Sequence, residues 1–153
     1  MKLRLFAAVA VLLVAAEAPG DEATEWKRLE GTWRLSYAEV NGRVIDKEDL
    51  PPLRLVVAGE KMTFLIEDRD LGLGTFRLSP GYSPKLIDQT RAVRGETGPR
   101  ARVEILEGIY RLEKDRLTIC LQGRARAVKE RPTEFATQSG SGLRLQVFEC
   151  EKP

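Results

Sequence analysis

Residues 53–66 read LRLVVAGEKMTFLI, and this stretch decides the fold. Apolar side chains occupy every second position on both sides of Gly59-Glu60, with Leu55 in the first run and Phe64 in the second. A period of two places alternate side chains on one face of a β-strand, whereas a helix repeats every 3.6 residues. The glycine between the runs marks a tight turn. The segment therefore predicts two antiparallel strands that share one apolar face.

The same alternation continues in both directions along the chain. Five further runs show it: Trp33 and Leu35; Phe76 and Leu78; Tyr110 and Leu112; Leu117, Ile119 and Leu121; Leu143, Leu145 and Val147. Turn residues separate the runs, as at Asn41-Gly42 and Gly140-Ser141-Gly142. Residues 21–29 predict a short helix before the first run. We therefore predict an all-β fold of about eight to ten strands with a short N-terminal helix.

A sheet of this size has to protect its edges. Consecutive antiparallel strands joined by short turns favour a single up-and-down β-barrel, because closure removes the edges. A two-sheet sandwich keeps its edges, and the spacing of the strands leaves that alternative open. The 153 residues, 42% hydrophobic and 31% charged, fit one domain, which we assign to residues 21–153.

Residues 1–20 predict a secretory signal peptide. Lys2 and Arg4 precede an apolar run from Leu5 to Ala16, and small residues follow as far as Gly20. The run is short for a membrane span, although a retained anchor helix is the alternative. We expect an exported protein, periplasmic or extracellular, with no membrane span after the signal peptide is removed.

Composition excludes several classes of function. Without residues 1–20 the chain has 23 basic and 22 acidic residues, which is no footprint for nucleic acid. The sequence contains no His, which excludes His-dependent acid–base catalysis and His-ligated zinc. Carboxylate pairs remain chemically possible, but none stands in a recognisable motif. We therefore expect no enzyme activity, no metal site and no cofactor.

The two cysteines, Cys120 and Cys150, raise the question of a disulfide, because exported proteins fold in an oxidising compartment. If residues 133–137 form a strand between their two strands, the cysteines lie about 9–10 Å apart. A disulfide needs Cα atoms within about 7 Å. We expect Cys120 to be a half-buried strand residue and leave the bridge open. Cys150 could pair with another molecule; otherwise we expect a monomer.

Ordered short motifs from Leu29 to Phe148 carry a family resemblance. They are Leu29-x-Gly31-Thr32-Trp33, Gly74-Thr75-Phe76, Pro84-Lys85-x-Ile87-Asp88, Gly108-Ile109-Tyr110, Leu117-Thr118-Ile119-Cys120, Arg131-Pro132-Thr133-Glu134-Phe135 and Gly140-Ser141-Gly142. The set resembles the planctomycete uncharacterised-domain family of exported proteins, which is similar to lipocalin-like barrels. Residues 91–103 form a longer, more Arg-rich connection than is usual in that family, and Cys150 stands where a basic residue is more usual. The resemblance implies a fold and no activity.

The resemblance also implies structural roles for several side chains. In lipocalin-like barrels a Trp on the first strand plugs the closed end, and a late Arg stacks on it. The plug would be Trp33, and the cation would be Arg131 or Arg144. Glu134 would accept hydrogen bonds from Arg131 or Lys85. These residues would close the barrel rather than bind a ligand.

One functional hypothesis places a small apolar ligand inside the barrel. An eight-stranded barrel either fills its interior with side chains or holds one small ligand there. Tyr82 or Tyr110 would serve as a polar handle for the ligand. The expected interior residues are Leu55, Phe64, Phe76, Tyr110 and Ile119.

A second hypothesis, which we favour, is a non-catalytic interaction module of the cell envelope or exterior. Irregular loops on a rigid scaffold often bind partners, and the partner would be an unknown protein or an envelope polymer. A basic rim formed by Arg94, Arg100, Arg124 and Arg126 would suit an anionic polymer. Interleaved acids such as Glu96 fit the alternative that these loops only keep the barrel mouth soluble.

Overall fold

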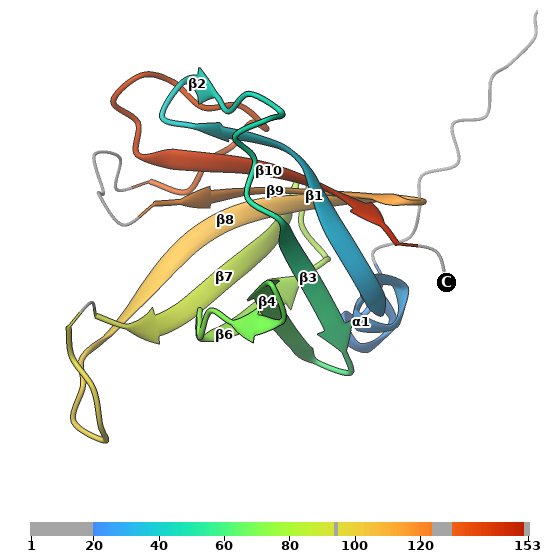
Figure 1. Ribbon diagram of the computed structural model, residues 1–153. Helices are drawn as coiled ribbons and strands as arrows, with labels where there is room; N and C mark the ends of the chain where they lie inside the picture. The colour runs from blue at the N-terminus through green and yellow to red at the C-terminus, as the bar shows by residue number, and fades with distance from the viewer. Residues whose placement is uncertain (1–19, 94, 124–129, 152–153) are drawn as a thin grey trace, which may run out of the picture.

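The computed structural model describes residues 20–93, 95–123 and 130–151. One antiparallel sheet of ten strands curls around a core, and a short helix lies at one end of it (Figure 1). The elements are α1 (Glu22–Leu29), β1 (Gly31–Val40), β2 (Arg43–Val44), β3 (Leu53–Ala58), β4 (Lys61–Ile66), β5 (Arg69–Asp70), β6 (Thr75–Ser79), β7 (Lys85–Ala92), β8 (Val103–Glu113), β9 (Arg116–Gln122) and β10 (Leu143–Cys150). The predicted all-β class and the N-terminal helix are confirmed. Because the ten strands form one sheet, the two-sheet sandwich is excluded.

The strand order is β5-β4-β3-β1-β10-β9-β8-β7-β6, with β2 beside β1. Most neighbours in the sheet are also neighbours in the sequence, as in a meander. β1 connects the two halves because it pairs with both β3 and β10. The two sides of the curl approach each other where the rings of Phe64 and Phe76 lie 5.5 Å apart. The result is a curled half-barrel whose edge strands are β5 and β6.

The inner face of the sheet carries the main apolar core. In the register, Leu55 of β3 lies opposite both Trp33 of β1 and Phe64 of β4. The ring of Phe148 in β10 packs 6.0 Å from that of Phe64. Residues 53–66 therefore form the two paired strands that their alternation predicts.

α1 closes one end of this core. Asp21 caps the helix by accepting a hydrogen bond from the Thr24 amide at 2.7 Å, and this bond lowers the pKa of Asp21. Trp26 and Leu29 are buried against the sheet. Gly31 follows with a φ of 133°, a conformation that favours glycine and turns the chain directly into β1.

The outer face of the sheet carries a second apolar cluster. Ile109, Cys120 and Leu145, from β8, β9 and β10, form it, and Phe135 packs against it. The segment of residues 130–142, which we call the cover segment, lies over this face. Residues 133–137 within it are not a strand, so the condition that would separate the two cysteines by an intervening strand is not met, and β9 pairs directly with β10.

The cysteines are both free. Cys120 lies opposite Leu145 of β10, whereas Cys150 lies opposite Trp33 of β1. Cys150 therefore lies five positions along β10 from Leu145, the residue opposite Cys120, which is about 17 Å at the usual strand rise. Cys120 is fully buried rather than half-buried. Burial raises the pKa of its thiol to about 11.

The predicted signal peptide, apart from Gly20, lies outside the described residues. Within residues 20–93, 95–123 and 130–151, no helix has the length and apolar character needed to cross a membrane.

Candidate functional site

A pocket of about 880 Å³ lies beside α1, at the rim of the sheet. Its walls come from α1, from the loop between β6 and β7, from β8 and from the cover segment. We call it the rim pocket and define it by six of its lining residues: Glu25, Arg28, Tyr82, Lys85, Arg111 and Phe135. Segments far apart in the sequence meet there, so the pocket depends on the tertiary structure.

Glu25 is the most buried charged residue of the rim pocket, with 0% of its surface exposed. The Lys85 Nζ donates to its Oε1 at 2.8 Å, and the Tyr110 hydroxyl donates to the same oxygen at 3.2 Å. The Arg28 Nη1 donates to Oε2 at 3.3 Å. An unpaired buried carboxylate costs several kcal/mol. Donors from α1, β7 and β8 compensate this cost, and they join the helix to the sheet.

The surroundings of Glu25 keep Tyr110 protonated. Burial, and then the negative charge of Glu25, raise the pKa of Tyr110 well above its usual range. The Tyr110 hydroxyl therefore keeps its proton and donates a hydrogen bond to the Glu25 carboxylate. Glu25 accepts from three groups and has little capacity left to act as a general base.

The open side of the rim pocket is aromatic and cationic. Tyr82, on the loop between β6 and β7, is 64% exposed. Pro80 and Pro84 frame this loop, and their fixed φ angles restrict its conformation. The Arg111 guanidinium lies 4.8 Å from the centre of the Phe135 ring, within the range of a cation–π contact.

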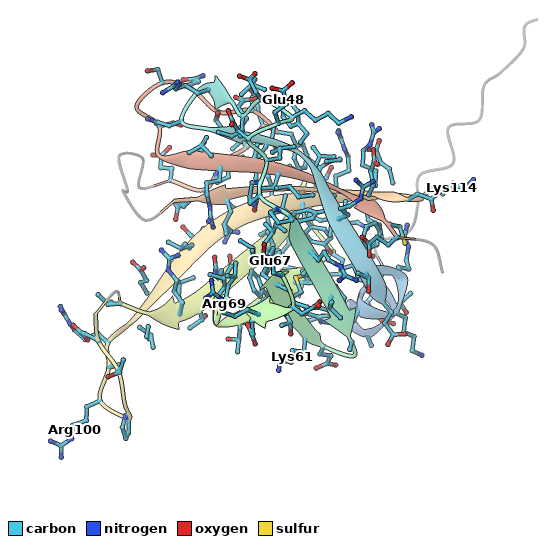
Figure 2. The ribbon with its side chains drawn as sticks, viewed as in Figure 1. Glu48, Lys61, Glu67, Arg69, Arg100 and Lys114 are labelled. Carbon is cyan, nitrogen blue, oxygen red and sulfur yellow. The ribbon has the colours of Figure 1, made fainter. Side chains whose placement is uncertain are left out.

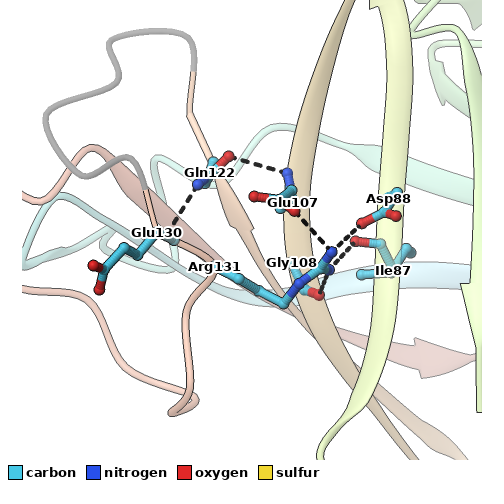
Figure 3. Close-up of polar contacts among 7 residues, drawn as sticks. All are labelled: Ile87, Asp88, Glu107, Gly108, Gln122, Glu130 and Arg131. Atoms are coloured by element: carbon cyan, nitrogen blue, oxygen red, sulfur yellow. Dashed lines mark hydrogen bonds and ion pairs between the residues drawn. The ribbon is translucent and has the colours of Figure 1, made fainter. Parts of the chain in front are cut away.

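Arg131 lies on the outer face of the sheet, where it anchors the cover segment (Figure 3). Its Nη1 donates to the Gly108 carbonyl at 2.7 Å. Its Nη2 lies 2.8 Å from Asp88 Oδ1 and 3.1 Å from Glu107 Oε1. Arg131 therefore holds β7, β8 and the cover segment together, which is a structural role.

The predicted stacking of an arginine on Trp33 is wrong. Trp33 is buried, as a plug should be, and its Nε1 donates to the Leu29 carbonyl at 2.8 Å. Arg131 binds the outer face, whereas the indole faces the core. Arg144 lies opposite Val40, at the other end of the β1–β10 ladder from Trp33. The indole is instead anchored at its edge, where its N–H donates to the last residue of α1.

The predicted role of Glu134 is also wrong. Glu134 is exposed on the cover segment. Its two expected donors bind other carboxylates, since Lys85 binds Glu25 and Arg131 binds the acids of β7 and β8.

The predicted interior residues lie on the inner face of the sheet, as expected. Four of the five are buried in the main core, namely Leu55, Phe64, Tyr110 and Ile119. The fifth, Phe76, is partly buried and packs against that core. Of the five, Tyr110 also lines the rim pocket. Four of the five predicted interior residues therefore belong to the core alone, and Tyr110 belongs to both the core and the rim pocket.

Of the predicted basic rim, the structure describes Arg100. It is exposed at the far end of the β7–β8 hairpin (Figure 2). Arg94, Arg124 and Arg126 lie outside the described residues. The rim pocket uses the other end of β8, so Arg100 is not part of it.

Sequence reasoning missed Glu25, the centre of the site. One signal was present, because Glu25 lies four residues before Leu29 and therefore on the helix face that also carries Trp26. The partners Lys85 and Tyr110 stand within quoted motifs, but 60 and 85 residues away in the chain. Nothing in the local sequence pairs them.

Over the part of the chain that the structure describes, no group of His, Cys, Asp and Glu side chains is arranged to hold a metal ion. Comparison with protein-family models, with curated proteins and with solved structures finds no match. The function has to be argued from the site itself.

Proposed function

We propose that this chain is an exported, non-catalytic binding protein with a lipocalin-like barrel, and that its ligand occupies the rim pocket. The rim pocket carries the proposal. Its volume of about 880 Å³ falls within the usual range for small-molecule sites. Its walls combine an exposed aromatic ring, Tyr82, with a buried and fully compensated carboxylate, Glu25. Fixed polar groups beside aromatic and apolar side chains are typical of a ligand site.

Two observations support the barrel and the export. β1 pairs with both β3 and β10, which brings the first and last long strands together as in an up-and-down barrel. The basic and apolar pattern of residues 1–20 is that of a signal peptide. An envelope or extracellular address follows from this pattern.

Binding without catalysis fits the chemistry of the site. The carboxylate of Glu25 is occupied by donors from Lys85, Tyr110 and Arg28. The raised pKa of Tyr110 keeps that phenol from acting as a base. The chain contains no His to take the role.

Nuclear magnetic resonance tests the proposal directly. The ¹⁵N-labelled mature chain is titrated with benzoate, octanoate and glucuronate as three separate probes. We expect at least one probe to shift the amides of Thr24, Tyr82 and Thr133, because these residues line the pocket on three different segments. Shifts confined to the residues around Arg100, at the far end of the β7–β8 hairpin, or no shifts with all three probes, would contradict the proposal.

A matched pair of variants sharpens the test. Tyr82→Ser removes the exposed ring from the pocket, and Val103→Ser removes an apolar side chain of similar exposure, 66% against 64%, outside it. We expect the first to weaken probe binding about tenfold, because aromatic contacts contribute roughly a kcal/mol each. The second should leave binding unchanged. Equal effects of the two variants would contradict a role for the pocket.

A second candidate function is binding of a small ligand inside the barrel. Two buried polar residues on the inner face of β7 favour this function. Gln89 is 0% exposed and its Oε1 has no hydrogen-bond partner, while Arg91 is 5% exposed and its Nη2 has none. Such groups cost about 1–3 kcal/mol each when unsatisfied. Native mass spectrometry decides between the sites: a bound small molecule retained in Tyr82→Ser but lost in a folded Gln89→Met variant would favour the interior.

A further inference from the structure

The rim pocket presents an aromatic ring that the fold itself does not use. Tyr82 is a large side chain on a loop framed by prolines, and 64% of it remains exposed beside the pocket. An exposed ring of this kind offers a flat apolar face to a partner and a hydroxyl at its edge. A sugar ring, which has apolar C–H faces and polar edges, complements both features.

The charge of the lining favours an anion. The lining contains three cations, Arg28, Lys85 and Arg111, and one carboxylate, Glu25, which gives it a formal charge of +2. Arg111 also pairs with Glu113 at 3.3 Å, but both side chains are about half exposed, so this pair is weak. The guanidinium of Arg111 remains suited to a carboxylate, whose two oxygens match its planar set of donors.

Hydroxyl groups complete the lining. Thr24, Ser83 and Thr133 stand around the pocket and can each donate and accept a hydrogen bond. A fatty acid would leave these hydroxyls without partners in the ligand. Inorganic phosphate would use the cations and leave the Tyr82 ring without a partner. A ligand with a ring, a carboxylate and several hydroxyls uses all three parts of the lining.

We infer that the ligand of the rim pocket is an acidic saccharide, a uronic acid or a short chain of such units. One sugar ring packs on Tyr82, and its carboxylate lies toward Lys85 and Arg111. This inference rests on the proposed function, since it names the ligand class of the same pocket. Uronic acids occur in polysaccharides of cell surfaces, which agrees with the proposed envelope or extracellular address.

Isothermal titration calorimetry with trigalacturonate tests the inference, and neutral galactotriose serves as the matched ligand. We expect trigalacturonate to bind at least about tenfold more tightly, and its affinity to fall at high salt because the charges are partly exposed. Tyr82→Ser and Arg111→Gln should each weaken trigalacturonate binding about tenfold. Arg100→Gln, which changes an exposed arginine away from the pocket, should not alter it.

The outcomes separate this inference from the proposed function. Equal binding of the two trisaccharides would contradict the acidic-saccharide inference. So would no binding of either while benzoate or octanoate still shifts the pocket amides. In both cases the proposal of a ligand in the rim pocket would stand. No probe acting at the pocket would overturn both. Trigalacturonate binding that Arg100→Gln abolishes and Arg111→Gln leaves unchanged would place the site at the far end of the hairpin, around Arg100, and overturn the inference.

Discussion

The two faces of the β8–β9 hairpin are both buried, but different structures cover them. The inner face packs into the apolar core, and α1 closes the end of that core (Figure 1). The outer face is covered by residues 130–142, which have no regular secondary structure. Cys120, on the outer face, is as fully buried as Leu117 on the inner face.

The helix α1 and the cover segment differ in how they form their hydrogen bonds. α1 forms part of its backbone hydrogen bonds internally, and two side chains of the sheet, Lys85 and Tyr110, donate to its one buried carboxylate, Glu25. The cover segment has no internal ladder and relies on side chains. The Thr137 amide donates to Glu39 at 3.1 Å, and the Cys120 thiol donates to the Ala136 carbonyl at 3.7 Å. Loss of one group should therefore cost more at α1 than at the cover segment.

The largest expected effect is at Glu25. Glu25→Ala leaves Lys85 and Tyr110 without their buried acceptor and should lower the free energy of unfolding by about 3–5 kcal/mol. Urea denaturation followed by tryptophan fluorescence measures the change, since Trp26 and Trp33 are both buried near the site.

A double variant separates lost charge pairing from lost packing. Glu25→Leu with Lys85→Met replaces the pair by apolar side chains of similar size and should recover most of the stability. If the double variant is as unstable as Glu25→Ala, the unpaired charge of Lys85 is not the main cause of the loss of stability in Glu25→Ala.

An intermediate effect is expected at Arg131. Arg131→Met removes the bonds to Gly108 and the ion pairs with Asp88 and Glu107, which should cost roughly 2 kcal/mol because charged hydrogen bonds contribute about 1.5–3 each and the site is partly exposed. The cover segment should loosen, so Cys120 should react faster with a thiol reagent.

The control is Arg102→Met. Arg102 pairs with Glu96, but its side chain is 78% exposed, so its loss should change stability by less than about 0.5 kcal/mol. An unchanged rate of Cys120 labelling in Arg131→Met would show that Arg131 does not hold the cover segment in place.

The smallest effect is expected at Thr137 and depends on pH. The Thr137 hydroxyl donates to Glu39 at 2.5 Å, and this bond lowers the pKa of Glu39 below its ordinary value of 4.5. A lowered folded-state pKa stabilises the protein above the unfolded pKa, and the contribution is lost as the pH falls through the folded value. Thr137→Val should therefore cost about 1 kcal/mol at pH 7 and progressively less below about pH 4.5.

Denaturation midpoints of the two proteins between neutral and acid pH measure this difference. A constant gap across the range would mean that Thr137 acts through packing or through the bond that it accepts from the Gly42 amide, and not through the carboxylate of Glu39.

Much of the fold could be predicted because it depends on local pattern. The alternation in residues 53–66 predicted β3 and β4, and the acids and apolar residues of 21–29 predicted α1. The burial of Trp33 also agreed with expectation. The role of Arg131 could not be predicted, because its partners on β7 and β8 stand 23 to 44 residues earlier in the chain.

The sequence by itself determined seven of the ten strands, the short helix and the apolar inner face, since a period of two is a property of neighbouring residues. Only the tertiary structure decided that the outer face of β9 is buried as well. It also decided that Glu25 meets Lys85 and Tyr110, 60 and 85 residues further along. The physical reason is that a buried charge is tolerable only where distant donors converge on it, and that convergence depends on the path of the whole chain.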